Sequence, residues 1–235
     1  KAIIDSIGAT GEAGRLVTVR VPELIAYQDV AYAERYASVV KRVLQAEQKA
    51  VPGQSGLTEA AARYLHKLMA YKDEYEVARL HADPEFLASL DAQFKHGYTV
   101  KYNLAPPQFA KRHPVTGELI KQPFGGWMLS AFRWLQRFKG LRGTALDVFG
   151  KSEERIKERK LIEDYIALLD LIIQELTPQN HAAAVALASV PDEIRGYGHV
   201  KEKSMVAAEK LQQQRLASFR HQEAGVMRIS AEAVV

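Results

Sequence analysis

The residues best suited to chemistry lie between Trp127 and Arg142, where basic and aromatic side chains are interleaved. Basic groups bind phosphates and carboxylates, and aromatic rings stack on bases, so this composition is typical of surfaces for nucleic acids or acidic proteins. Helical spacing places Arg133 and Arg137 on one face. The opposite, apolar face carries Phe132, Leu135 and Phe138. Three interpretations stay open: a core helix with a basic solvent-facing side, a docking site for an acidic protein, and a nucleic-acid surface.

Positive charge is concentrated around this segment. Residues 95–146 contain nine lysines and arginines and one acid, whereas the whole chain has a net charge of only +4. The rest of the chain is therefore net negative, and an acidic partner fits the middle of the chain better than its ends. We expect four basic residues to form part of a docking surface for such a partner, and we do not expect nucleic acid to be that partner. They are Arg133, Arg137, Lys139 and Arg142.

A glycine-rich string near the start, Gly8-Ala-Thr-Gly11-Glu-Ala-Gly14, has a spacing close to that of a dinucleotide-binding turn. That motif needs a helix immediately afterwards, because the helix N-terminus meets the pyrophosphate. β-Branched residues and then Pro22 come after it instead. The string therefore predicts a flexible connector.

Other catalytic and metal-binding patterns are incomplete. The chain has no cysteine, which removes disulfides, thiolate zinc sites and ordinary iron–sulfur ligation. Its seven histidines show no His-x-x-x-His or Glu-x-x-His spacing. The acids from Glu153 to Asp164 alternate with lysine and arginine, which predicts a solvated helix face. We expect no catalytic, cofactor-binding or metal-binding residue in this chain.

The ends and the apolar runs give further expectations. No apolar run is long enough for a membrane span, and the start is neither a signal peptide nor a transit peptide. Together with the absence of cysteine, this predicts a cytoplasmic location with no membrane partner. The first residue is Lys1, so we expect a piece of a longer polypeptide.

The elements that must position these residues are mainly helical. Hydrophobic periodicity predicts about seven helices with a small two- or three-stranded β element in the middle. The expected helices cover 22–48, 58–81, a segment from 84, 126–139, 153–176, 177–191 and 199–221, and the expected short strands cover 98–104 and 118–121. Thr58, Asp83 and Ser152 are the expected N-caps. Leu169 belongs to an apolar stripe on the 153–176 helix and is expected in the core.

The domain organisation depends on these elements. Residues 1–21 carry three glycines and a strand-like run at 16–21, so we interpret them as a linker or the end of a preceding domain. Residues 22–222 form the expected helical module, and residues 223–235 form a tail without a clear pattern.

Six strings of the chain keep the order that they have in a known family. They are Ala26-Tyr-Gln-Asp-Val-Ala-Tyr-Ala-Glu-Arg-Tyr36, Leu68-Met-Ala-Tyr-Lys-Asp-Glu-Tyr-Glu-Val-Ala-Arg-Leu80, Tyr102-Asn-Leu-Ala-Pro-Pro107, His113-Pro-Val-Thr-Gly-Glu118, Phe138-Lys-Gly-Leu-Arg-Gly-Thr144 and Ile194-Arg-Gly-Tyr-Gly-His-Val-Lys201. The segment that they span resembles the C-terminal region of large, fused 2-oxoacid:ferredoxin oxidoreductases of the indolepyruvate type.

The resemblance implies a parent enzyme that decarboxylates an aryl pyruvate on thiamine diphosphate, held through a metal ion, Mg. Such an enzyme passes electrons through [4Fe–4S] clusters to ferredoxin and forms an acyl-coenzyme A. The Gly-Asp-Gly…Asn signature for thiamine diphosphate is missing here, and so are the cysteines for clusters. The resemblance covers roughly Leu24 to Lys201 and implies that the helical module comes after a catalytic γ-type domain, with residues 1–21 as a linker or the end of that domain.

The expected function is that of a non-catalytic helical C-terminal module. It would pack against the catalytic domains of the parent chain, make the contact of a homo-oligomer, or dock ferredoxin. The alternative is a free-standing basic module that binds an acidic protein or nucleic acid. A large exposed apolar face favours the first interpretation, and salt-sensitive nucleic-acid binding favours the second.

Overall fold

The computed structural model describes residues 1–105, 120–196 and 198–232, with side chains described up to His221 except at 198 and 199. Ten α-helices and one two-stranded antiparallel sheet are present in this part of the chain. The mainly α class with a small central β element is confirmed, but the helices outnumber the seven expected. The chain forms two compact units, with residues 72–149 inserted as unit 2 into unit 1, which comprises residues 1–71 and 150–235.

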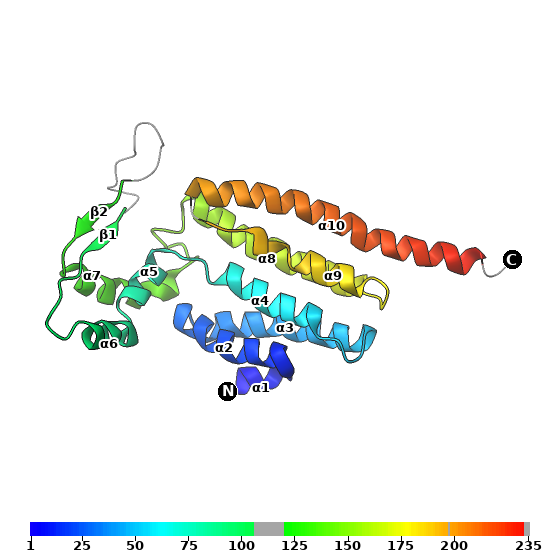
Figure 1. Cartoon of the computed structure of the whole chain (residues 1–235), viewed down its shortest axis with the longest axis horizontal. Helices are drawn as coiled ribbons and strands as arrows, with labels where there is room; N and C mark the ends of the chain where they lie inside the picture. The colour runs from blue at the N-terminus through cyan, green and yellow to red at the C-terminus, as the bar shows by residue number, and fades with distance from the viewer. Residues whose placement is uncertain (106–119, 197, 233–235) are drawn as a thin grey trace. The chain divides into compact units, whose positions relative to one another are not determined.

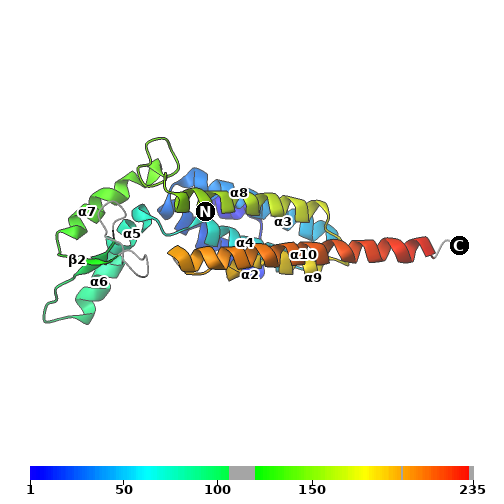
Figure 2. The ribbon, with the colours of Figure 1, turned by 90° about the horizontal axis from the view of Figure 1, so that it is seen from above.

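Unit 1 is a helical body assembled from both ends of the chain (Figure 1). Its elements are α1 (Ala2–Ile7), α2 (Gly11–Tyr27), α3 (Val30–Ala50), α4 (Gly56–Met69), α8 (Glu153–Gln174), α9 (His181–Ala188), the 3₁₀ turn η2 (Val190–Glu193) and α10 (Gly198–Glu232). Helix α4 is central, because it contacts α2, α3, α8 and α9. Figure 2 shows α10 running along the α9 side of this body.

The first 21 residues differ from the expectation. The strand predicted at 16–21 is wrong, because these residues lie within α2, and Leu16, Val17 and Val21 are buried in the core of unit 1. Burial of one apolar helix face outweighs the weak strand preference of the β-branched residues. Pro22 lies inside α2 rather than at a helix start. The next helix, α3, begins after Asp29, whose side chain caps it by accepting from the Tyr32 N–H.

The helix expected over 58–81 is also divided. Helix α4 ends at Met69, and a separate helix begins only at Glu74, after Asp73. Thr58 lies in the first turn of α4 rather than at its cap, and its hydroxyl donates to the carboxylate of Glu47. The cap and apolar stripe of α8 are confirmed: Ser152 accepts from the Arg155 N–H, and Leu169 is fully buried.

The C-terminal elements shift in length. The helix expected at 177–191 forms only over α9, followed by η2, whereas α10 continues to Glu232. The patternless tail expected from residue 223 is therefore helical up to residue 232. No helix in the described residues is long and apolar enough to cross a membrane.

The described residues of unit 2, the smaller unit, form three α-helices, one 3₁₀ helix and an antiparallel pair of strands (Figure 1). Its elements are α5 (Glu74–His81), α6 (Pro84–Gln93), β1 (Tyr102–Leu104), β2 (Gln122–Phe124), α7 (Met128–Leu135) and the 3₁₀ helix η1 (Gln136–Leu141). The first strand is shorter than expected, and the return strand lies just beyond the expected 118–121, of which 118 and 119 are outside the described residues. Asp83 caps α6 as predicted, accepting from the N–H groups of Glu85 and Phe86.

Candidate interaction site

The four basic residues expected at a docking surface are not equivalent in the structure. Arg133 on α7 and Arg137 on η1 are exposed, one helical turn apart, whereas Lys139 is half-buried. Arg142 is buried and paired with Asp73. The expectation for Arg142 is therefore corrected, because a charge neutralised inside the unit cannot be presented to a partner.

Arg133 and Arg137 line a surface pocket of about 500 Å³ that lies wholly within unit 2. One wall is apolar and is built by α6 and the residue after α5. The lining residues of that side are Ala82, Pro84, Leu87 and Ala88. The α7–η1 segment supplies Arg133, Gln136 and Arg137, and α6 also supplies Asp91.

Of the charged side chains in this pocket, the carboxylate has a hydrogen-bond partner and the two arginines have no ion-pair partner among the described residues. Asp91 accepts a hydrogen bond of 2.6 Å from the hydroxyl of Tyr98. Among the described residues, neither Arg133 nor Arg137 has an acidic partner within ion-pair distance. The pocket therefore offers two guanidinium groups and one already hydrogen-bonded carboxylate beside an apolar wall.

Helix α7, which carries Arg133 and leads directly into η1 with Arg137, packs against an aromatic cluster. Phe132, next to Arg133 in the sequence, is buried, as the sequence predicted. Its ring stacks on His81 with centroids 5.2 Å apart and meets Tyr102 edge-on. Because α7 is anchored on this side, the arginine positions are set by the core of unit 2.

Unit 2 exposes much apolar surface besides the pocket. Within the described residues it buries six apolar or aromatic side chains but leaves nine large ones exposed. The exposed set is Leu80, Phe86, Phe94, Tyr98, Ile120, Trp127, Trp134, Leu146 and Val148. Both tryptophans of the chain belong to it, with 65% and 62% of their surface accessible. The interleaving of the aromatics is visible in the sequence, but the sequence does not show that the tryptophans face outward.

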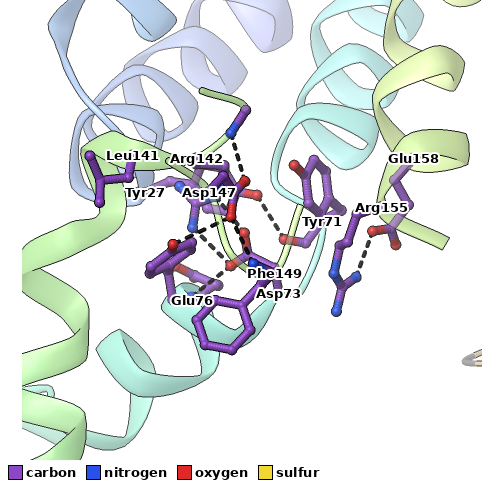
Figure 3. A network of polar contacts seen from close by, with 12 residues as sticks. Tyr27, Tyr71, Asp73, Glu76, Leu141, Arg142, Asp147, Phe149, Arg155 and Glu158 are labelled. Carbon is purple, nitrogen blue, oxygen red and sulfur yellow. Dashed lines mark hydrogen bonds and ion pairs between the residues drawn. The ribbon is translucent and has the colours of Figure 1, made fainter. Parts of the chain in front are cut away.

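A buried polar cluster joins the two ends of unit 2 (Figure 3). Arg142 donates to both oxygens of Asp73, at 2.5 and 2.9 Å, and Asp73 also caps α5 through the Glu76 N–H. Asp147 accepts from the hydroxyl of Tyr75 and from the backbone N–H groups of Gly143 and Phe149. Burial, with the Asp147 carboxylate close by, raises the pKa of Tyr75 to about 12. The cluster fastens the loop after η1 to the start of α5, which is a structural role.

A second buried carboxylate, Glu47 of α3, organises unit 1. It accepts from the N–H of Leu57, from the N–H and hydroxyl of Thr58, and contacts His181 Nε2 at 2.7 Å. Burial raises the pKa of Glu47, but these hydrogen bonds outweigh burial, so its pKa lies below the ordinary value. The first N–H groups of α4 are thus satisfied by a side chain of another helix.

His66 of α4 is a buried histidine of unit 1. Its Nε2 lies 3.0 Å from the Glu23 carboxylate, and its ring packs edge-on against Tyr36. Burial, together with the charge of Arg20, lowers the pKa of His66 to about 4, although Glu23 acts in the opposite direction. The imidazole is therefore neutral at pH 7 and belongs to the core.

The acidic run on α8 is partly structural rather than solvated. Glu158 is buried, contrary to expectation, and is paired with Arg155 and Lys201. Figure 3 shows the Arg155–Glu158 pair, and the guanidinium of Arg155 also lies over the ring of Tyr71. Of the exposed acids in the run, Asp164 pairs with Lys160 within α8, whereas Glu163 pairs with Arg35 of α3.

The glycine string near the start does not form a dinucleotide-binding turn. Gly8, with φ of 73°, ends α1, and Gly11, with φ of 59°, begins α2. Helix α2 begins within the string, contrary to expectation, but another helix, α1, precedes the string where the motif needs a strand. In the described residues, no three histidine, aspartate or glutamate side chains are grouped closely enough to hold a metal ion.

Residues 13–214 match a protein family of unknown function, DUF6537. The chain belongs to this family. The matched range begins within α2, before the boundary predicted at residue 22, and ends within α10. It contains the whole of unit 2, so the insertion lies inside the family's domain. No curated protein and no solved structure matches the chain.

Proposed function

We propose that the chain is a non-catalytic docking module of an indolepyruvate-type 2-oxoacid:ferredoxin oxidoreductase and packs against the catalytic domains of its parent. The observation that carries the proposal is the surface of unit 2. Among its described residues, unit 2 has more large apolar side chains exposed than apolar side chains buried. Large exposed apolar side chains, and tryptophans above all, are enriched in protein–protein interfaces and favour such a contact for unit 2.

The tryptophans make this surface unusual. Tryptophan is enriched in interfaces, where it supplies a large apolar area with few rotatable bonds. Trp127 contacts the ring of Phe124, and Trp134 contacts the ring of Phe138. Each indole is thus held by one neighbouring ring, while most of its surface stays accessible. A partner that covers these rings would bury the apolar area that unit 2 alone leaves in water.

The nature of the parent rests on the six ordered sequence strings, which extend from Ala26 to Lys201 and run through both units. Under this proposal, thiamine diphosphate, Mg and [4Fe–4S] clusters belong to the catalytic domains of the parent. A chain without cysteine supplies no thiolate ligand to a cluster. The proposal includes an electrostatic contact between the exposed Arg133 and Arg137 and ferredoxin, and a homo-oligomeric parent.

The test uses the complete natural polypeptide that contains this chain. It should reduce ferredoxin when supplied with an aryl pyruvate and coenzyme A. After mild proteolysis between module and catalytic domains, the two parts should still elute together from a gel-filtration column. Trp127→Ser combined with Trp134→Ser should separate them while the isolated chain keeps its circular dichroism spectrum.

The matched control replaces two exposed apolar residues of unit 1, Val30→Ser and Val206→Ser, and should leave the parts together. A complete polypeptide without aryl pyruvate oxidation would overturn the assignment to this enzyme class. Wild-type parts that separate as readily as the tryptophan variant would overturn the packing role.

A further inference from the structure

We propose that the pocket between α6 and the α7–η1 segment is a seat for an acidic protein segment, which inserts an apolar side chain against α6 and places carboxylates on Arg133 and Arg137. The inference deepens the docking role proposed above and rests on it. It names the chemistry of the partner at one defined place.

Helix α6 presents an apolar side that unit 2 does not cover. None of its residues is fully buried, although Phe86, Leu87 and Leu90 are all apolar. Leu87 and Ala88 face the pocket, together with Pro84 of the first turn. A ligand that covers this apolar side of α6 removes it from water, which lowers the free energy of the complex.

The two arginines have a geometry suited to carboxylates. Residues four apart in a helical segment lie on the same face, and both Arg133 and Arg137 line the pocket. The planar guanidinium group binds carboxylates through two parallel hydrogen bonds, and such charge-assisted bonds are stronger than neutral ones. Gln136 adds an amide between them along the chain.

The negative charge in the pocket is carried by Asp91 of α6, whereas the arginines belong to the α7–η1 segment. Asp91 belongs to the lining on the α6 side, where its carboxylate is held by Tyr98. It repels an acidic group that approaches that side. A ligand is therefore oriented, with its apolar part toward α6 and its carboxylates toward η1.

A protein segment fits these features better than nucleic acid does. Proteins that follow a phosphate backbone use an extended positively charged groove and aromatic platforms. This pocket contains two cations, one anion and an apolar wall of small and aliphatic residues. The pocket is open at the surface and has a volume of about 500 Å³, so a protruding side chain can enter it from a partner's surface.

The experiment titrates the isolated chain with a fluorescent helical peptide in which glutamates flank a leucine and a phenylalanine, and follows anisotropy at low salt. A second peptide has every glutamate replaced by glutamine, and a third arm is a labelled DNA duplex. The acidic peptide should bind, and the binding should weaken as salt rises because exposed charges are screened. The glutamine peptide and the duplex should bind more weakly.

Two variants test the two sides of the pocket. Arg133→Glu with Arg137→Glu should weaken peptide binding at least about tenfold, because two charge-assisted contacts become repulsive. Leu87→Ser should weaken it without changing its salt dependence. Lys101→Glu with Lys121→Glu changes the charge of unit 2 equally at two other exposed positions and should have little effect.

The inference is overturned by an acidic peptide that does not bind, by equal losses in the arginine and lysine double variants, or by a DNA duplex that binds more tightly. Each of these results leaves aryl pyruvate oxidation by the complete polypeptide unaffected. A failure of the pocket is therefore distinguishable from a failure of the proposed function.

Discussion

Replacing Arg142 by leucine should destabilise unit 2 and leave unit 1 nearly unchanged. The guanidinium of Arg142 and the carboxylate of Asp73 are only 3% and 5% exposed, and they are joined by two hydrogen bonds. Removing one partner of a buried pair leaves the other charge uncompensated, which costs about 3–5 kcal/mol. Asp73 would keep one donor, the N–H of Glu76.

The assay is hydrogen exchange followed by mass spectrometry, because it reports each unit separately. At about 1.4 kcal/mol per factor of ten, amides of α5 and α7 should exchange roughly 100-fold faster or more in Arg142→Leu. Amides of α3 in unit 1 should keep their rates. Adding Asp73→Asn should recover part of the loss, since the amide can still cap α5 without a buried charge.

The matched control is Arg195→Leu, which removes an exposed pair with Asp192. Those side chains are 69% and 48% exposed, and exposed pairs contribute less than about 1 kcal/mol. If Arg142→Leu changed the hydrogen-exchange protection of unit 2 no more than this control does, the polar cluster would not be what stabilises unit 2.

Three further predictions concern unit 1. Leu169→Ala should lower the free energy of unfolding by about 2–5 kcal/mol in a urea titration, because Leu169 is fully buried, and a loss below about 0.5 kcal/mol would be inconsistent with a core position. Since the pKa of His66 falls from 6.5 to about 4 on folding, the unfolded chain binds the extra proton between these pH values. About 3 kcal/mol of stability should therefore be lost as pH drops from 6.5 to 4, and His66→Gln should flatten that slope in urea titrations at several pH values. Glu47→Gln should lower the free energy of unfolding by about 1–3 kcal/mol at pH 7, because an amide cannot accept all the hydrogen bonds that Glu47 accepts. The variant should also lose less stability than the wild type when the pH falls below the ordinary carboxyl pKa. An unchanged midpoint of urea unfolding at pH 7 would argue against this role of Glu47.

Much of the helical architecture is predictable from local signals. Asp83 and Ser152 precede helices with the side chains that cap them, and the apolar stripe around Leu169 has helical spacing. The mistakes arise where tertiary burial decides. Val17 and Val21 have side chains that favour strands, yet α2 buries them against the rest of unit 1.

The candidate site is predictable only in part. The spacing of Arg133 and Arg137 predicts a shared face, and the structure exposes both in one pocket. Arg142 looks equivalent in the sequence because it belongs to the same basic run, but its partner Asp73 lies 69 residues earlier in the chain. This ion pair depends on the fold of unit 2, which brings the N-terminal and C-terminal ends of the unit together, and no local sequence pattern predicts it. The same holds for Glu47, whose partners Thr58 and His181 come from α4 and α9.

Oxidative footprinting of the tryptophans tests the central claim most directly. In the isolated chain, Trp127 and Trp134 should both be oxidised readily by hydroxyl radicals, as their exposed surfaces predict. In the complete natural polypeptide, we predict strong protection of both rings, while exposed Ile156 of unit 1 serves as the reference residue. Equal oxidation of the two tryptophans in the isolated chain and in the complete polypeptide would contradict the proposal that unit 2 is a docking surface.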